Sequence, residues 1–327
     1  MIDRVYPWID THLHCRDQKL KYKATIKSTA ELSAKYGGIA FVDMPNNNPV
    51  TTSLNEVLQR FRIAIDAGCI ERYNLNMGLT KDPEQIKTAA SAAKRIPKVN
   101  ALKFFTAGKE DDVLAIKKEV DQNTVYSTLK ECKYDGVVIV HCEDEAMFNM
   151  GKFDPERPWT WNDQRPPAAE EHAAYKQIKL SEENGFLWHL HFPHVSSPGT
   201  FDIIEDAHER GLRVSGEVTP HHLLRSTDYM TGPEGLVLKT NPPVRPQKVV
   251  DELWEKLRNT KVPFTIGSDN AQHTDEEKMN PPYASGHQSI PLYPELLQQM
   301  RRREFSEKYI IRLANGNARE IFPKIKV

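Results

Sequence analysis

The chain has 327 residues, of which 39% are hydrophobic and 27% are charged, and its formal net charge is −1 at pH 7. A chain of this length can bury the core of one large α/β domain, and its near-zero charge argues against binding to nucleic acid or to an anionic membrane surface. No window approaches the roughly 18 apolar residues of a membrane-spanning helix, and the first residues lack a signal-peptide pattern. Its four cysteines form no C-x-x-C pair, which is typical of reduced thiols. We therefore expect a soluble, cytoplasmic protein that binds neither nucleic acid nor membranes.

Short β-rich apolar runs alternate with longer amphipathic stretches along the chain. In chain order, the predicted strands are Val5–Ile9, Gly38–Val42, Tyr73–Met77, Ala101–Phe105, Gly136–Val140, Phe186–His191, Arg213–Val218 and Pro263–Ile266. The predicted helices are Ser28–Tyr36, Leu54–Ala67, Glu84–Arg95, Val125–Cys132, Pro167–Asn184, Thr200–Arg210, Val249–Arg258, Ile290–Arg302 and Ser306–Ile321. Eight strands alternating with helices favour an α/β fold of parallel units, and eight is the number that closes a TIM-type (β/α)8 barrel. We predict a single barrel domain over residues 1–327, with a doubly wound open sheet as the alternative fold.

Two segments between the predicted elements lack a regular pattern. Gly151–Pro167 is rich in proline and tryptophan, and we interpret it as a long loop over the active face. Gln272–Pro291 is a candidate lid. Either segment could instead be an inert surface loop.

The strongest local signal is the pair His12 and His14, which directly follows the first predicted strand. At a spacing of two residues, extended backbone points both side chains to the same face. Neutral imidazole is a common ligand for zinc and related metals. An H-x-H pair alone is a weak signal, but active sites of these barrels lie at the C-terminal ends of the strands, where this pair is expected.

More residues of metal-binding type are expected at the same end of the barrel. They are Lys103 within the fourth predicted strand, His141 at the end of the fifth, His194 after the sixth and Asp269 after the eighth. Each alone could be a structural polar residue, but together they favour a metal site. A protonated Lys103 beside cations would suffer both desolvation and like-charge repulsion. Either this lysine faces outward, or its amine has reacted with carbon dioxide to give an anionic carbamate that can bridge two metals.

The order of motifs resembles that of one enzyme family over nearly the whole chain. The matching stretches are DTHLHCRD (10–17), DMPNNNPVTT (43–52), LKFF (102–105), VHCEDE (140–145), HFPHVSS (191–197), GEVTPHHL (216–223), KTNPPVR (239–245), GSDNAQH (267–273) and NAREIF (317–322). In this respect the chain is similar to the dihydroorotases of the amidohydrolase superfamily, in the lysine-bearing branch of the cyclic amidases. That resemblance implies a metal-dependent barrel, and because the chain begins almost at the first predicted strand, we expect it to lack the accessory β-sandwich of many relatives.

The resemblance also implies roles for individual residues. The first metal would be bound by His12, His14 and Asp269, the second by His141 and His194, and both by carbamylated Lys103. Two Zn²⁺ ions are expected, although this ligand type also suits manganese or cobalt. Arg16, Asn46 and His273 would bind a substrate carboxylate, which a guanidinium, an amide and an imidazole suit chemically. Glu217 would either support an extra metal or act as a buried structural carboxylate.

The implied reaction is the reversible cyclisation of N-carbamoyl-L-aspartate to L-dihydroorotate in pyrimidine biosynthesis. A hydroxide between the two metals would attack the ring carbonyl, with Asp269 as general acid and base. One alternative is a related cyclic amidase acting on allantoin, a hydantoin or a dihydropyrimidine, and another is a non-catalytic scaffold. The chain departs from the family pattern at Asn270, at Gln272 and in Gly286–Pro291, which affects the lid more than the metal site. A homodimer or an association with a transcarbamoylase would be compatible with this function.

Overall fold

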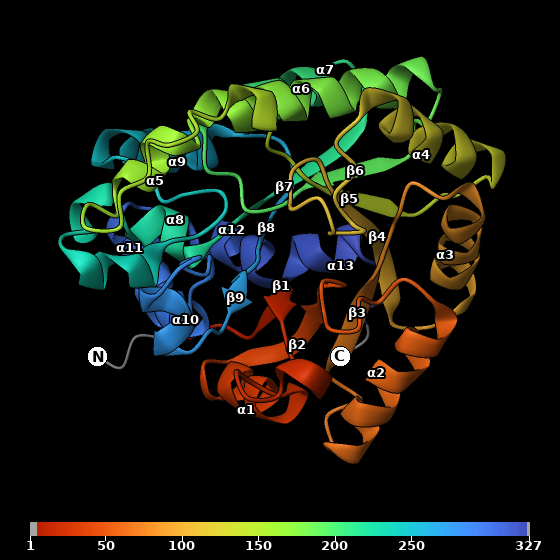
Figure 1. Ribbon diagram of the computed structural model, residues 1–327, viewed down its shortest axis with the longest axis horizontal. Helices are drawn as coiled ribbons and strands as arrows, with labels where there is room; N and C mark the ends of the chain where they lie inside the picture. Colours follow the sequence, from red (N-terminus) through yellow and green to blue (C-terminus); the bar gives the residue numbers. More distant parts are fainter. Residues whose placement is uncertain (1–4, 326–327) are drawn as a thin grey trace.

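The computed structural model describes residues 5–325, in which nine parallel strands form one curved sheet surrounded by helices (Figure 1). The strands are β1 (Trp8–His14), β2 (Gly38–Asp43), β3 (Tyr73–Gly78), β4 (Val99–Phe105), β5 (Val137–His141), β6 (His189–Phe192), β7 (Arg213–Val218), β8 (Phe264–Ile266) and β9 (Asn270–Ala271). Their spatial order runs from β8 down to β1 and then to β9. Because β9 follows β8 closely in the chain and pairs with the end of β1, the sheet closes on itself. The predicted barrel is confirmed, and its strand order lacks the reversal of a doubly wound sheet.

Helices alternate with the strands as predicted. The longer ones are α1 (Ile26–Lys35), α2 (Leu54–Asp66), α3 (Pro83–Arg95), α4 (Glu119–Glu131), α6 (Pro167–Glu183), α7 (Pro198–Glu209), α9 (Gln247–Asn259) and α11 (Tyr293–Arg302). The shorter ones are α5 (Thr160–Gln164), α8 (Pro220–Leu224), α10 (Asp275–Met279), α12 (Glu307–Ile311) and α13 (Asn317–Ile321). Capping boxes at Thr25, Ser53 and Thr274 explain where three of these helices begin, because each hydroxyl accepts from an otherwise unpaired backbone N–H.

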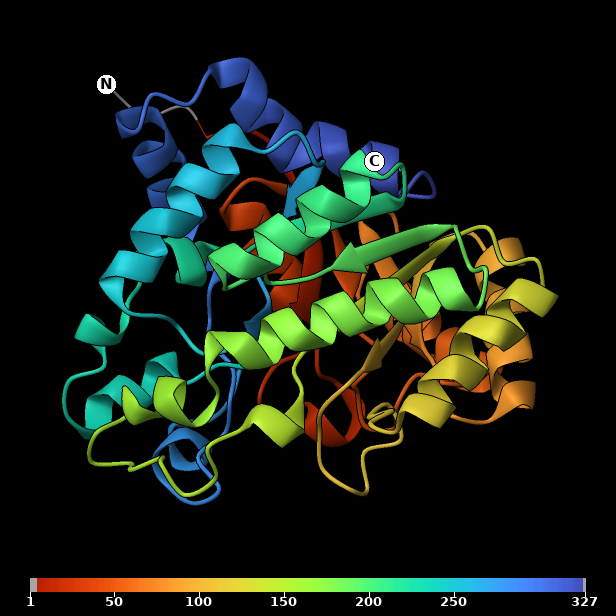
Figure 2. The same cartoon turned by 90° about the horizontal axis from the view of Figure 1, so that it is seen from above.

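Alternation along the strands separates two buried layers. On β4, Leu102 and Phe104 belong to the large core between the sheet and the helices, whereas Ala101 faces the barrel interior. The interior residues at the amino ends of the strands form a small apolar core with α13 and the residues after it, which include Ile321 and Phe322. Figure 2 shows the C-terminal helices at one end of the barrel and several long connections at the other. The amino end is thus filled with apolar side chains, and the carboxyl end is left for polar ones.

Several predicted boundaries were wrong. The first strand was expected at Val5–Ile9 but runs from Trp8 to His14, so His12 lies on the strand rather than after it. The prediction followed apolar residues, whereas the strand continues through polar residues that face the closed barrel interior. The last predicted helix is divided by a π-helical turn at Arg312–Gly316.

The two segments predicted to be irregular each contain a short helix. Helix α5 lies within Gly151–Pro167, and α10 lies within Gln272–Pro291. Within residues 5–325, every strand belongs to the barrel sheet, and none of the helices is long and apolar enough to cross a bilayer. The expected lack of an accessory β-sandwich stays a prediction.

Candidate metal centre

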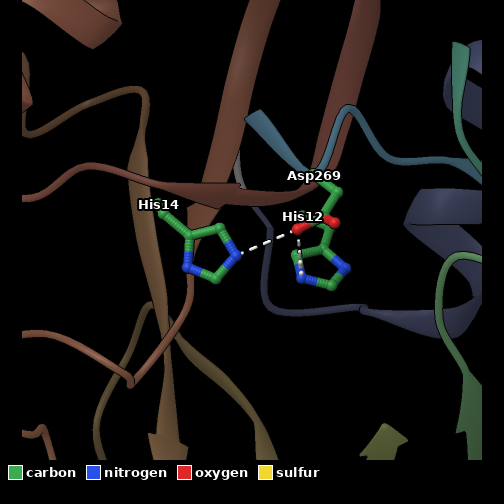
Figure 3. A group of neighbouring side chains, drawn as sticks. All are labelled: His12, His14 and Asp269. Atoms are coloured by element: carbon green, nitrogen blue, oxygen red, sulfur yellow. Dashed lines mark hydrogen bonds and ion pairs between the residues drawn. The ribbon is translucent and has the colours of Figure 1, made fainter. Parts of the chain in front are cut away.

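The carboxyl end of β1 and the residues after β8 bring three metal-binding side chains together. Ligand atoms of His12, His14 and Asp269 all lie within 4.8 Å of one another, and all three residues are buried. Asp269 Oδ1 is 3.0 Å from His14 Nε2 and 3.3 Å from His12 Nε2. Figure 3 shows both imidazoles directed at this carboxylate. The structure thus brings together the three residues that were predicted to bind the first metal.

A hydrogen-bond network between β1 and β8 holds Asp269 in this position. Asp10 accepts hydrogen bonds from Ser268 N at 2.8 Å and from Ser268 Oγ at 2.6 Å. The backbone N–H of Asp269 donates to His12 O at 2.7 Å, and its φ of 48° lies in the left-handed region. Such a backbone conformation is uncommon for a residue with a side chain and is kept where the surroundings fix it. The ring closure of the barrel therefore aims this carboxylate at the two histidines.

His12 has its ring orientation and tautomer set by Glu217. Glu217 Oε1 lies 2.8 Å from His12 Nδ1, and an ionised carboxylate can only accept, so Nδ1 carries the hydrogen. Although burial alone would raise the pKa of Glu217, the contacts with His12 and His191 hold it well below its usual range. The lone pair of His12 is therefore on Nε2, which faces Asp269. Glu217 is thus a buried carboxylate in contact with His12, an arrangement common behind histidine ligands, and a role at an extra metal stays a prediction.

Lys103 faces the barrel interior, as its position on β4 requires. It is fully buried, and its Nζ lies 2.9 Å from His12 Nε2, which excludes the outward-facing alternative. Burial lowers the pKa of Lys103 to about 8, although the negative charges of Asp269 and Glu217 act to raise it. The neutral amine, which is the form that reacts with carbon dioxide, is therefore accessible near neutral pH.

His141 and His194 form a second cluster beside the first. His141 ends β5 and His194 follows β6, and the distance from His141 Nδ1 to His194 Nε2 is 2.9 Å. The ring of His194 is also 5.3 Å, centroid to centroid, from that of His12. Burial is the main cause that lowers the pKa of both His141 and His194, so both are neutral imidazoles near pH 7. The six predicted ligands thus lie on one end of the barrel.

The predicted substrate-binding residues are brought together in part. Arg16 Nη2 lies 3.1 Å from His273 Nε2, and Arg16 Nε donates to Gln272 O at 3.2 Å. Burial, together with the charges of Arg16 and Lys23, lowers the pKa of His273 to about 3, so its Nε2 is the acceptor in this pair. Asn46 is half-buried, and its Oδ1 has no hydrogen-bond partner within residues 5–325. Because His273 is neutral and Asn46 is an amide, Arg16 is the positively charged group of this set.

Two residues near the site were not predicted from the sequence. Glu143 contacts His141 Nε2 at 2.8 Å, and Arg165 donates to Glu143 Oε1 at 2.8 Å. Glu143 stands two residues after His141, a spacing that could have suggested a shared orientation. Arg165 lies within the segment interpreted as a loop, and no local signal indicates its contact with a residue 22 positions earlier.

Comparisons with solved structures identify the class of fold. The model superimposes with a TM-score of 0.81 on the L-hydantoinase (dihydropyrimidinase) from Arthrobacter aurescens, at 21% identity, covering 97% of this chain and 70% of that one. For the dihydropyrimidinase from Brevibacillus agri the TM-score is 0.80 at 20% identity, covering 97% and 71%. For the dihydroorotase from Campylobacter jejuni it is 0.73 at 18% identity, covering 97% and 83%. The chain therefore shares the TIM-type barrel fold of these three structures.

Sequence comparison narrows the resemblance to one group. The chain is 29% identical to a dihydroorotase from Shouchella clausii over 274 residues, which cover 83% of this chain and 61% of the relative. It is 29% identical to a dihydroorotase from Listeria welshimeri over 287 residues, which cover 84% and 62%. No protein-family model matches the chain. The chain is thus similar to dihydroorotases over most of its length, while it spans about three fifths of the length of these relatives.

Proposed function

We propose that the protein is a metal-dependent dihydroorotase that interconverts L-dihydroorotate and N-carbamoyl-L-aspartate. The observation that carries this proposal is the convergence of His12, His14 and Asp269 beside the buried Lys103. A carbamate on this amine would supply an anionic ligand that suits a pair of cations. The similarity to dihydroorotases supports the choice of reaction. A homodimer or an association with a transcarbamoylase stays a prediction.

The donor atoms fit divalent cations. Because Nδ1 of His12 donates to Glu217, the lone pair of this imidazole is on Nε2, which lies beside both Lys103 Nζ and Asp269 Oδ1. Nδ1 of His14 and Nδ1 of His194 are buried and have no hydrogen-bond partner within residues 5–325. Both rings therefore carry a polar atom that no described residue satisfies. Neutral imidazole, carboxylate and carbamate oxygen are ligands that zinc accepts. We propose two Zn²⁺ ions, the first on His12, His14 and Asp269 and the second on His141 and His194.

The residues of this chain divide the chemistry among them. Bound divalent cations would polarise the ring carbonyl and lower the pKa of the attacking water. Although burial alone would raise the pKa of Asp269, contacts with His12 and His14 hold it well below its usual range, so the carboxylate is ionised. Asp269 takes a proton from the attacking water and gives it to the ring nitrogen as the amide bond breaks. Arg16 holds the substrate carboxylate through charge-assisted hydrogen bonds.

The carbamate on Lys103 would form from its neutral amine and carbon dioxide. The neutral amine attacks carbon dioxide, a nitrogen–carbon bond forms, and one proton leaves to solvent. The product carries a negative charge, which replaces the unfavourable positive charge of a lysine among cations. We expect Lys103→Ala to abolish turnover and to weaken the binding of both metals. Turnover near that of the wild type would remove Lys103 from the site.

The direct test is the ultraviolet-monitored turnover of dihydroorotate by the purified protein, with and without added zinc. We expect activity that depends on the metal and a much slower reaction with dihydrouracil, which lacks the ring carboxylate. Equal rates on the two substrates would contradict the proposal. A protein that binds no metal and shows no activity after metal addition would instead favour a scaffold.

One observation favours a second candidate function. Two of the solved structures with high TM-scores are named as hydantoinase or dihydropyrimidinase, and both superimpose better than the dihydroorotase from Campylobacter jejuni. A cyclic amidase for substrates without a carboxylate would have little use for Arg16 at the mouth of the barrel. Replacing Arg16 would then leave the turnover of a hydantoin unchanged, whereas dihydroorotate turnover would be absent in the wild type.

A further inference from the structure

Glu143 contacts the candidate second metal site without being one of its predicted ligands. It lies two residues after the end of β5 and is 1% exposed, and its Oε2 lies 2.8 Å from His141 Nε2. An ionised carboxylate can only accept, so the hydrogen of the neutral imidazole is on Nε2. The lone pair of His141 is consequently on Nδ1, the atom that faces His194 Nε2 at 2.9 Å. Glu143 therefore selects the tautomer that a metal ligand at this position needs.

Arg165 keeps Glu143 ionised and fixes its orientation. Arg165 Nε donates to Oε1 of Glu143 at 2.8 Å, and Nη2 donates to Oε2, so both carboxylate oxygens are engaged in a fork. The guanidinium also lies 4.3 Å from the ring centroid of Phe148 and 5.3 Å from that of Trp161. Because the arginine also packs against these two rings, the carboxylate that it binds has little freedom to turn away from His141.

Arg245 ties this pair to the loop that carries His194. Arg245 Nη1 donates to the backbone oxygen of Arg165 at 2.6 Å, and its Nε donates to Ser196 Oγ at 3.1 Å. Ser196 stands two residues after His194, and its backbone N–H donates to Glu170 at 3.0 Å. One buried network thus supports both histidines of the second cluster. The ring of His12 in the first cluster is oriented by Glu217, which also accepts from the backbone N–H of His194 at 3.2 Å.

We propose that Glu143 and Arg165 are positioning residues that set the tautomer of His141 and thereby determine binding of the second cation. This inference rests on the proposed function, because that function places a cation between His141 and His194. It adds that the imidazole rings of His12 and His141 are oriented by different carboxylates, Glu217 and Glu143. A change at Glu143 should therefore weaken the second cation selectively.

Glu143→Gln gives a sharp test, because an amide has one accepting oxygen where the carboxylate offers two to Arg165 and His141. The amide nitrogen either faces Arg165, which breaks the fork, or donates to His141 Nε2, which moves the imidazole hydrogen to Nδ1. In both cases the negative charge that holds the hydrogen on Nε2 is lost. We expect titration of the metal-free protein with Co²⁺ to give two tight sites in the wild type and one in Glu143→Gln. The affinity of the second site should fall by about 10- to 100-fold. The visible spectrum of cobalt in the first site should be unchanged.

Two further variants make the result interpretable. Glu145→Gln is the matched control, because Glu145 contacts Gly108 N and Lys117 rather than His141, and it should keep two tight sites. Arg165→Lys keeps the positive charge but loses the fork, and it should weaken the second site less than Glu143→Gln does. If Glu143→Gln does not fold, Arg165→Lys carries the test by the same titration.

The outcomes separate this inference from the proposed function. Two tight sites with unchanged affinity in Glu143→Gln would overturn the inference and leave the proposed function standing. Equal loss of both cations in a folded Glu143→Gln or Arg165→Lys protein would also overturn it, because a general structural role would then explain the effect. A wild-type protein that binds no cation would contradict the proposed function itself.

Discussion

The same strands build two different environments at the two ends of the barrel. At the amino end, inward-facing Ala101 on β4 and Val137 on β5 pack against Ile321 and its neighbours from the C-terminal helix. A few residues further along these strands, the inward positions are occupied by Lys103 and His141. Every one of these side chains is buried, so burial alone does not distinguish the two ends. The difference lies in what each burial contributes: apolar contacts favour folding, whereas buried ionisable groups cost free energy unless they are paired.

This contrast explains how the barrel carries its candidate site. The apolar core and the outer layer against the helices can supply stability that does not depend on the metal. The polar end can then hold several groups with shifted pKa values, as functional sites commonly do. Changes at the amino end should therefore alter stability without altering chemistry, whereas changes among the metal-binding and substrate-binding residues at the carboxyl end should alter chemistry.

The largest effect is expected for Asp269→Asn at the carboxyl end. The amide keeps an oxygen that can serve as a ligand but cannot take a proton from water. We expect kcat for dihydroorotate to fall by about 10²- to 10⁴-fold, the usual contribution of a general acid or base. Steady-state kinetics at saturating substrate, together with metal analysis, would measure it. A kcat within tenfold of the wild type would remove Asp269 from the proton-transfer role.

Ile321→Ala makes the corresponding change at the amino end. Ile321 is 4% exposed and lies in the apolar core inside the barrel. Truncating such a side chain costs about 2 to 5 kcal/mol through lost burial and the cavity left behind. Chemical denaturation of the metal-free protein would measure this loss. The bound metal per chain should stay as in the wild type, and a loss of metal would show that the two ends are not independent.

Acid should destabilise the metal-free protein through the buried histidines near the carboxyl end. Burial lowers the pKa of His222 to about 4, from an ordinary value of 6.5. Between these values the unfolded chain binds more protons than the folded one, so stability is complete above pH 6.5 and is lost as the pH falls to about 4. The contribution is roughly 3 kcal/mol. His222→Gln should reduce the number of protons taken up on unfolding in this pH range by about one. An unchanged slope of the unfolding free energy against pH would show that His222 is not the group that titrates.

Short apolar runs made much of this architecture predictable. Lys103 was placed within a strand and His141 at the end of one because both stand in such runs, and the structure has them on β4 and β5. The first strand was misplaced because its inward positions beyond Ile9 are polar, so hydrophobicity ends before the strand does. The strand on which a candidate ligand stands can thus be predicted from the local sequence. The end of a strand cannot be predicted from hydrophobicity where its inward side chains are polar.

The supporting contacts were much harder to anticipate. Glu217 was recognised as a candidate, but its partner His12 lies 205 residues away, and only the closed ring brings them together. Arg165 belongs to a segment with no regular pattern, and its fork to Glu143 depends on the path of that segment. The side chains that hold ligands in place do so through contacts between distant parts of the chain, and such contacts leave no periodic pattern in the local sequence.

The smallest effect is expected for Arg16→Ala, which separates substrate binding from metal binding within the carboxyl end. Arg16 is buried and donates to Gln272 O, and its Nη2 lies beside His273. Loss of a hydrogen bond to a charged group costs about 1.5 to 3 kcal/mol, so KM for dihydroorotate should rise by about 10- to 100-fold. The metal content should stay constant, and kcat should change less than KM, because Arg16 touches the carboxylate rather than the scissile amide. An unchanged KM would show that the carboxylate is bound elsewhere, and a loss of metal would show that this side chain supports the ligands instead.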